Sequence, residues 1–329
     1  MKVMKRITTV IFSIVCSLIL LQTNAQKEKK EYPFSKEDNI SKSYPAAGNS
    51  LNIENKFGKV EIITWNSNEI KVDVHIKVSS SNKEYAEKTF DAIKVNDEKN
   101  GNDISLKTSI KSAGCNNCNN SMKIDYTVHL PADTKLKIKN SFGPIIIPDY
   151  NGELSIENKF GDMTAQTLSN IKSLLFEFGT ANINSLNNVD AAFKFSSVEL
   201  NNLTGNNNFK FDFCNAVKIK LANILYSLNI NESYSTINLK PEPNFSASYN
   251  INTNFSSFVN RSDIDIQRTN EPTSKYGPDS KKIYEGKSGN GTAKVEIKSK
   301  FGNIIIGEPK PGDIKEKKHK DTDSENEEI

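Results

Sequence analysis

A chain of 329 residues is long enough for one large domain or two modest ones. Its formal net charge of +3 falls to zero without Lys2, Lys5 and Arg6, because the remaining 40 Lys and Arg then balance the 40 Asp and Glu. A neutral chain without a basic stripe is a poor nucleic-acid binder. An apolar fraction of only 36% favours the thin core of an elongated repeat protein over a compact α/β enzyme.

The first 25 residues predict an export signal. Their basic start is followed by an apolar run at 7–21, and residues 23–25 supply small side chains for signal peptidase, so we expect cleavage before Gln26. The apolar run is short for a membrane-spanning helix, which needs roughly 20 residues, and an uncleaved anchor is the alternative. No second hydrophobic segment follows in the sequence, so we expect a mature chain that is soluble or peripherally attached to a membrane.

Two segments precede the main repeats. Residues 26–50 are charged and contain Pro33 and Pro45, which predicts a flexible lead-in. Residues 51–135 are predicted to form an N-terminal capping region with a first repeat, further strands, and a helix opened by a capping box at 81–84. We expect this small α+β insertion to cover the open edge of the repeats, because bare strand edges invite aggregation.

One sequence pattern recurs about nine times along the chain. Two alternating apolar residues are followed by an aromatic residue four positions later, then by a small residue and two more apolar residues, as in LNIENKFGKVEI from Leu51. Between Phe142 and Phe255 the aromatic residues are about 17 to 21 residues apart, within the range of solenoid turns. The aromatic anchors are Phe57, Phe142, Phe160, Phe178, Phe195, Phe213, Tyr234, Phe255 and Phe301.

The position after each anchor predicts a corner. In the first copy Leu51 and Ile53 have one parity and Val60 and Ile62 the other, so a single straight strand would expose half of them. A glycine there supplies positive φ and lets the next turn approach closely. We therefore predict strand–corner–strand units that stack in parallel, with the aromatic anchors forming one internal ladder in the core. The corner glycines are Gly58, Gly143, Gly161, Gly179 and Gly302, and Ser196, Cys214, Ser235 and Ser256 occupy the same position elsewhere.

The position two residues before each anchor changes along the chain. Stacked asparagines can form hydrogen bonds as a ladder, whereas stacked aromatic rings fill a dry interior. We therefore expect the middle turns to be wider and more apolar than the end turns. The residues are Asn55, Asn140 and Asn158 early, Phe176, Phe193 and Phe211 in the middle, and Glu232, Thr253 and Ser299 late.

These patterns predict an all-β chain: a parallel β-solenoid (β-helix) of about nine turns with the small α+β insertion near its N-terminus. The predicted segments are a signal peptide at 1–25, the lead-in at 26–50, the capping region at 51–135 and solenoid repeats at 136–261. A loop at 262–292, a final turn at 293–307 and a disordered charged tail at 308–329 complete the chain.

The start LNIENKFGKVEI, the junction VHLPADTKLKIKNSFG and the closing SGNGTAKVEIKSKFGNIII resemble the putative-adhesin family of bacterial β-solenoid envelope proteins. The similarity covers roughly residues 50–307, and residues 23–26 are similar to export signals of Bacteroidetes-type bacteria. The resemblance implies an envelope protein with a parallel β-solenoid. The family defines no catalytic residues that could be carried over to this chain.

The three cysteines beyond the predicted signal are too few for a disulfide framework. Cys115 and Cys118 lie in an Asn-rich loop, where we expect a small disulfide clip or inert thiols. A redox pair or a metal site is the alternative, although the loop offers no helix N-terminus, and only His75 and His129 are spare as further ligands. Cys214 occupies a corner position and is expected to be a small buried filler.

We find no sequence evidence for an enzyme. The histidines form no recognisable triad, and outward acids such as Glu54, Glu157 and Glu177 are expected to be solvated strand positions. We therefore predict no catalytic, cofactor-binding or metal-binding residues and no cofactor. A glycan-active enzyme, a lyase or hydrolase, on the same β-helix scaffold is the alternative, and it would need carboxylates clustered on one strand face.

The function expected from the sequence is that of a non-enzymatic, exported envelope protein located in the periplasm or on the outer cell surface. It would act as an adhesin-like structural or binding module that presents a repetitive sheet face to an unidentified envelope protein or surface polymer. A periplasmic partner of a membrane signalling protein, with the charged tail as its contact, is a further alternative. The oligomeric state is left open.

Overall fold

A computed structural model describes residues 32–111, 119–272 and 279–314. The predicted signal peptide at 1–25, Cys115 and Cys118 lie outside these residues. The described part is all-β, with one helix, α2 (Lys83–Ala92). Its strands are β1 (Phe34–Pro45), β2 (Ser50–Lys56), β3 (Val60–Thr64), β4 (Glu69–Ser80), β5 (Ile93–Asn100), β6 (Asp103–Ile110), β7 (Asn120–Leu130), β8 (Lys135–Ser141), β9 (Ile145–Ile147), β10 (Leu154–Lys159), β11 (Met163–Leu168), β12 (Ile171–Glu177), β13 (Thr180–Asn187), β14 (Asp190–Lys194), β15 (Ser197–Asp212), β16 (Ala216–Ser233), β17 (Thr236–Pro241), β18 (Ala247–Asn254), β19 (Ser257–Arg261), β20 (Ile266–Arg268), β21 (Lys281–Ser288), β22 (Ala293–Lys300) and β23 (Asn303–Gly307).

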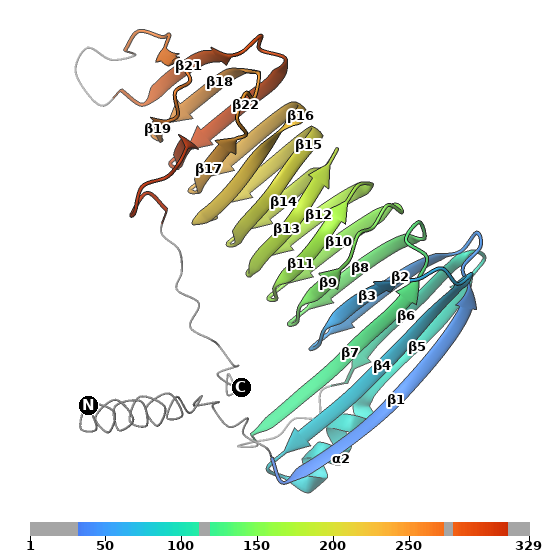
Figure 1. Cartoon of the computed structure of the whole chain (residues 1–329). Helices are drawn as coiled ribbons and strands as arrows, with labels where there is room; N and C mark the ends of the chain where they lie inside the picture. The colour runs from blue at the N-terminus through green and yellow to red at the C-terminus, as the bar shows by residue number, and fades with distance from the viewer. Residues whose placement is uncertain (1–31, 112–118, 273–278, 315–329) are drawn as a thin grey trace, which may run out of the picture. The chain divides into compact units, whose positions relative to one another are not determined.

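The strands form one large and mostly parallel sheet, in which each unit pairs with the next in the same register (Figure 1). In the β8–β10 pair Leu136 lies opposite Leu154, and Asn140 lies opposite Asn158. The strand after each anchor pairs in a second parallel row, as β9, β11 and β13 do. Because the register is in phase, equivalent residues of successive units lie directly above one another.

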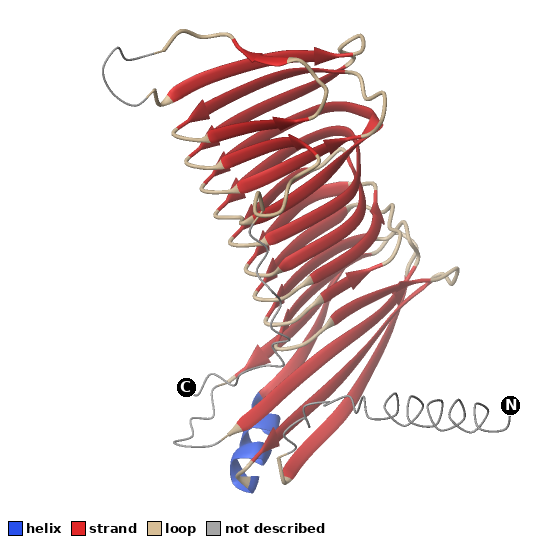
Figure 2. Ribbon diagram, turned by 60° about the vertical axis from the view of Figure 1, so that its left-hand side comes forward, coloured by secondary structure: helices blue, strands red, loops and turns tan. Residues whose placement is uncertain are grey.

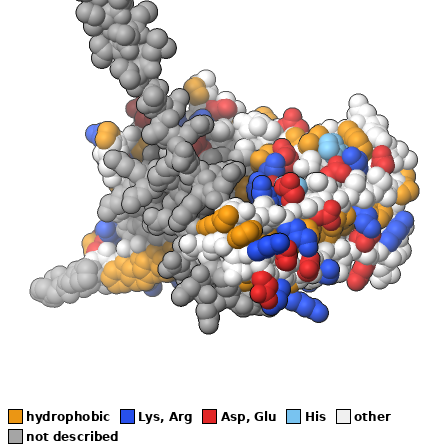
Figure 3. All heavy atoms as spheres, turned by 90° about the horizontal axis from the view of Figure 1, so that it is seen from below, with side chains coloured by type: hydrophobic (Ala, Val, Ile, Leu, Met, Phe, Trp, Pro, Cys, Tyr) orange, Lys and Arg blue, Asp and Glu red, His pale blue; other side chains and the backbone are white. Residues whose placement is uncertain are grey.

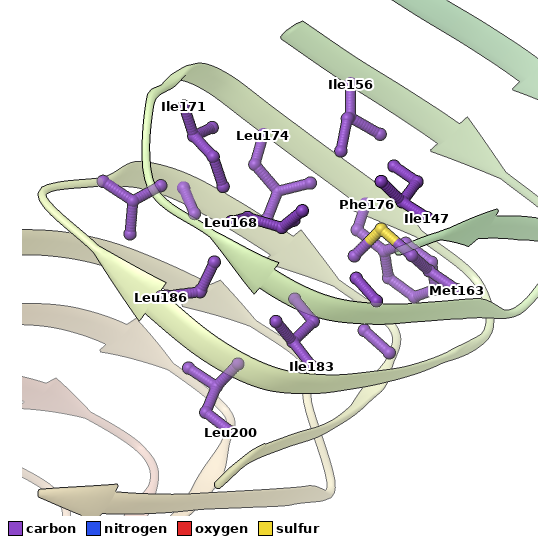
Figure 4. Packing of buried hydrophobic residues seen from close by; sticks show 14 of the residues in the cluster. Ile147, Ile156, Met163, Leu168, Ile171, Leu174, Phe176, Ile183, Leu186 and Leu200 are labelled. Carbon is purple, nitrogen blue, oxygen red and sulfur yellow. The ribbon is translucent and has the colours of Figure 1, made fainter. Parts of the chain in front are cut away.

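The alternating apolar residues of both rows point to a shared interior. Figure 4 shows Ile156, Leu174 and Phe176 on one side of this interior, with Met163 and Ile183 on the other. Phe176, Phe193 and Phe211 are fully buried, as expected of the apolar middle units. The shared core therefore comes from residues that alternate along each strand and repeat from unit to unit.

The first and last units are not at the ends of the stack. The β2–β3 unit lies between β6–β7 and β8–β9, because β2 pairs with both β6 and β8 and β3 with both β7 and β9. The β22–β23 unit lies between β16–β17 and β18–β19. Residues 293–307 are therefore the last unit along the chain, as predicted, but they are inserted between two earlier units rather than placed at the end of the stack.

Antiparallel strands pair at both ends of the parallel rows (Figure 2). At one end β1 pairs with β4, β4 with β7 and β5 with β6, and at the other β21 pairs with β18 and β20. The flexible lead-in predicted at 26–50 is thus wrong for β1, and the loop predicted at 262–292 is wrong for β20 and β21. An edge strand with one solvated face needs few apolar residues, so its sequence resembles a loop.

Two smaller predictions also change. The cap of α2 is Asn82, one residue after the predicted start, and its Oδ1 accepts a hydrogen bond from the Tyr85 amide at 3.0 Å.

The tail predicted to be disordered from 308 is ordered over 308–314. There Asp313 pairs with Arg261 at 3.2 Å, and Glu308 pairs with Lys240.

A buried carboxyl group joins the inserted unit to its neighbour. Glu232 of β16 is 3% exposed and accepts hydrogen bonds from Ser299 Oγ of β22 and, at 3.0 Å, from the Ser235 amide. Burial, with a smaller contribution from the charge of Asp212, raises the pKa of Glu232 to about 7, although the hydrogen bonds from Ser299 and Ser235 act to lower it. The folded chain therefore binds a proton at this site more tightly than the unfolded chain does.

We expect Glu232 to make the unfolding free energy depend on pH. The stabilising proton is fully bound in both states below about pH 4.5, and the stability that it contributes is lost as the pH rises towards about 7. Glu232→Gln should remove this dependence and gain up to about 3 kcal/mol relative to the wild type at pH 8. Chemical denaturation at several pH values between 5 and 8 measures the unfolding free energy of both proteins. As a control, Glu296→Gln replaces a half-exposed carboxyl on β22 and should leave the pH dependence of the unfolding free energy as in the wild type. If Glu232→Gln also left that pH dependence unchanged, Glu232 would not be its source.

Candidate functional site

The nine aromatic anchors form one continuous stack on the outside of the protein. Neighbouring rings have centroids 4.7–5.4 Å apart and planes within 1–9° of parallel, in the order Phe57, Phe142, Phe160, Phe178, Phe195, Phe213, Tyr234, Phe301 and Phe255. Their exposed fractions run from 36% to 56%. We call these nine residues the aromatic ridge. The predicted ladder exists, but the prediction that it lies in the core is wrong.

The backbone conformation of the anchors explains their outward position. Every anchor has a positive φ, from 51° at Phe195 to 61° at Phe57, whereas the corner glycines do not. On a continuous strand Phe160 would point inward with Ile156 and Asn158, but a left-handed residue breaks that alternation. The predicted corner is therefore present, one residue earlier than expected and at the aromatic residue itself.

The corner glycines are required because successive units approach closely. A Cβ on Gly161 would lie 2.0 Å from the carbonyl oxygen of Gly143, and one on Gly143 would lie 2.1 Å from that of Gly58. A Cβ on Gly179 would lie 2.3 Å from the carbonyl oxygen of Gly161, and a Cβ on Gly302 would meet the Glu232 carboxylate. The prediction that glycine lets successive units approach closely is confirmed, whereas the prediction that the corner glycines have a positive φ is wrong.

Inward polar side chains satisfy the corner carbonyl groups. Asn140 Nδ2 donates to the oxygens of Gly143 at 2.8 Å and of Gly58 at 3.1 Å, and Asn158 Nδ2 donates to that of Gly161 at 2.8 Å. The asparagines thus bind the backbone rather than one another. Where serine replaces the glycine, its hydroxyl bonds a carbonyl two residues earlier, as Ser196 Oγ does to Lys194 O at 2.6 Å.

Cys214 occupies one of these corners and is fully buried, as expected of a small filler. Its Sγ lies 3.4 Å from the carbonyl oxygen of Phe193. Burial raises the pKa of this thiol to about 11, so it is not a poised nucleophile.

Charged side chains beside the ridge neutralise one another. Glu177 pairs with Lys194 at 3.0 Å and with Lys159 at 3.3 Å, and Glu157 pairs with Lys139 and Lys159 at 3.3 Å. Partial burial raises the pKa of Glu177, but the two lysines outweigh it and leave that pKa below its usual value. Such carboxylates stay ionised at neutral pH and are poor general acids.

The other sequence candidates are not brought together. Figure 3 shows acidic and basic side chains interspersed on one face, without a large area of one sign. The described residues contain no group of three or more His, Cys, Asp or Glu side chains placed to bind a metal ion. His129 packs against Trp65, with centroids 5.2 Å apart, whereas His75 lies 3.6 Å from Glu37. Among the described helices none is long and apolar enough to cross a membrane.

No family model and no curated protein matches the chain. Similar solved structures include a putative adhesin from Bacteroides fragilis, with 11% identity and a TM-score of 0.41 over 82% of this chain and 97% of that one. A putative adhesin from Parabacteroides merdae has 9% identity and a TM-score of 0.38 over 84% and 98%. A putative lipid binding protein from Parabacteroides distasonis has 12% identity and a TM-score of 0.29 over 82% and 97%.

The resemblance to putative adhesins noted in the sequence therefore extends to solved structures that carry that name. At these identities and TM-scores no residue role passes from them to this chain.

Because the anchors have a positive φ, the stability of substituted anchors should not follow the hydrophobicity of the new residue. Phe160→Val should destabilise the protein more than Phe160→Asn does, by about 1 kcal/mol, although valine is the more apolar residue. Both variants lose the stacking with Phe142 and Phe178, but asparagine tolerates a φ of 55° and a β-branched residue does not. Urea denaturation provides the ranking, and a more stable valine variant would show that the corner carries no strain.

The glycine contacts predict a position that tolerates no side chain. Gly161→Ala should lower the unfolding free energy by at least about 3 kcal/mol or prevent folding, because the new methyl group would meet backbone atoms that cannot move aside. Gly101→Ala is the matched control: its Cβ would meet nothing within 4 Å and its φ is 59°, so it should cost only about 1 kcal/mol. Equal losses in the two variants would argue against close stacking at the corner.

Proposed function

We propose that the protein is an exported, non-enzymatic binding module of the cell envelope whose aromatic ridge docks into an apolar groove of an envelope protein. The scaffold is a parallel β-solenoid of about nine turns, with the α+β segment at 51–135 closing one end. The observation that carries the proposal is the row of nine exposed, stacked rings.

Stability alone does not account for aromatic residues at these corners. A left-handed conformation costs an L-residue about 1–2 kcal/mol, whereas one ring stacking contributes about 0.5–1.5 kcal/mol. The two effects nearly cancel at each corner. Glycine or asparagine adopts the same φ with little strain, so nine aromatic residues at such positions favour a role in binding.

The size of the ridge suits a protein partner. Nine rings that are roughly half exposed present on the order of 800 Å² of mostly apolar surface. That exceeds the usual apolar patch of about 300–600 Å² on a monomer and equals the area that one partner contributes to a standard interface, about 800 Å². The row spans about 40 Å at the spacing of adjacent strands.

The orientation of the rings favours a groove over a sugar. Sugars pack their C–H groups on aromatic faces, but each internal ring has both faces covered by its neighbours at about 5 Å. Only the ring edges are available along the ridge, and edges fit between apolar side chains. Contact through strand edges is disfavoured, because β1 presents charged residues such as Lys36, Glu37 and Asp38 at one end of the stack.

The enzymatic alternative gains no support from the site. The acids nearest the ridge are held in ion pairs, and each lysine between them bridges two units or pairs within its own strand. The lowered pKa values of Glu157 and Glu177 leave neither carboxyl protonated for the role of a glycosidase-type acid. Glu232, whose pKa is raised, is only 3% exposed and is held by Ser299 and Ser235 inside the protein.

Removing rings from the ridge should abolish binding. The mature chain from Gln26 is immobilised and titrated with detergent-solubilised envelope, and a saturable partner is identified and purified. Phe142→Asn/Phe160→Asn/Phe178→Asn should weaken its binding at least tenfold, because the substitutions keep the corner conformation while removing the apolar edges.

The matched control is Ile224→Asn/Tyr226→Asn, which removes apolar side chains that are 65% and 63% exposed on β16, outside the ridge. This variant should bind like the wild type. If the triple variant binds with unchanged affinity, or if both variants lose binding equally, the ridge is not the docking surface.

A further inference from the structure

A separate depression lies among the turns that connect the strands from β1 to β10. It has a volume of about 830 Å³, within the range of small-molecule sites. Five turns line it: 46–50 between β1 and β2, 65–68 between β3 and β4, 102–103 between β5 and β6, 131–135 between β7 and β8, and Asn151 after β9. In Figure 1 the strands that these turns connect lie side by side at the N-terminal end of the stack.

Backbone hydrogen bonds between the turns hold the depression in shape. The Ala46 amide donates to Asn68 O at 3.1 Å, and the Ser50 amide donates to Asn102 O at 2.9 Å. The Asn151 amide donates to Ala132 O at 3.1 Å. A ligand would therefore meet a surface that needs little ordering on binding, which favours affinity.

The lining is rich in primary amides. In the part of the chain that the structure describes, the side chains of Asn66, Asn102 and Asn151 are exposed and make no hydrogen bond to protein. An amide both donates and accepts, as does a sugar hydroxyl, so several amides on one wall match a polyhydroxylated ligand. Asp103 and Asp133 add two negative charges and Lys135 one positive charge, and charges of both signs disfavour a strongly anionic ligand.

An aromatic ring completes the depression. Trp65 is half-buried, and its indole Nε1 donates to Glu69 O at 2.8 Å, which fixes the ring in place. Unlike the rings of the ridge, Trp65 has no stacked neighbour in the described residues and is tilted by 38° against His129. A fixed, partly exposed indole among amides can pack against the C–H groups of a sugar.

We propose that this depression is a carbohydrate-binding site that takes the sugar units of a neutral oligosaccharide. The indole of Trp65 supplies the apolar platform, and the amides of Asn66, Asn102 and Asn151 bind hydroxyl or acetamido groups. The small apolar side chains of Ala47 and Ala132 leave room for a methyl group. The site is distinct from the aromatic ridge and gives the module a second kind of contact.

The test uses the fluorescence of Trp65, because it is the only tryptophan in the chain. The mature chain is titrated with chitotetraose, cellotetraose and maltotetraose, with sorbitol as a control for solvent effects. We expect a saturable change in emission with at least one tetrasaccharide and none with sorbitol, and calorimetry should give the same dissociation constant. Preference for chitotetraose would assign the acetamido group to the site.

Variants of exposed side chains avoid damage to folding. Asn66→Ala/Asn102→Ala should weaken tetrasaccharide binding at least tenfold, whereas Asn182→Ala/Asn215→Ala, exposed asparagines elsewhere, should bind like the wild type. The Phe142/Phe160/Phe178 triple variant should also bind sugar normally, so this proposal and that of the ridge fail separately. Absence of saturable binding to all three tetrasaccharides, or unchanged affinity in Asn66→Ala/Asn102→Ala, would overturn the assignment.

Discussion

In-register parallel stacking at the spacing of one strand is the constraint on which the rest of this structure depends. Because each unit lies directly on the next, whatever residue stands at the corner of one unit meets the same position of its neighbours. At the corner glycines this leaves no room for a Cβ, as the contact of Gly161 with Gly143 shows. At the residue before them, the same spacing brings aromatic rings into face-to-face contact at about 5 Å. One geometric repeat therefore produces both the tight backbone approach and the exposed ridge.

At both ends of the stack, strands pair with segments that are far from them in the sequence. The first repeat, β2–β3, pairs with β6 and β7, although β4, α2 and β5 lie between them in the sequence. Similarly, β22 pairs with β16, although β17 to β21 lie between them. Non-local insertion covers the parallel edges with antiparallel strands whose outer faces are charged. It also brings Ser299 against Glu232, so a carboxyl group is buried at the joint between two distant segments.

The candidate site was partly predictable. The nine anchors, their spacing and their stacking follow from the repeat, since identical residues in phase must lie above one another. Their outward position did not follow, because parity along the strand places Phe160 with Ile156 and Asn158. The alternation holds only while φ is negative, and nothing in the sequence assigns the positive φ to Phe160 rather than to Gly161. Glycine is the usual residue there, which is why the expectation failed. The depression around Trp65 gave no sequence signal, because its five turns lie at scattered positions between 46 and 151.

The sequence by itself determined the all-β class, the strand–corner–strand unit, its in-phase parallel pairing and the buried position of Phe176, Phe193 and Phe211. These properties depend on local alternation and on a repeat, and both are written along the chain. Only the tertiary structure decided which face carries the anchor rings, where the units at 51–64 and 293–307 lie in the stack, and that β1, β20 and β21 are strands. Those outcomes depend on a single backbone dihedral angle and on pairing between distant segments, and hydrophobic periodicity contains no information about either.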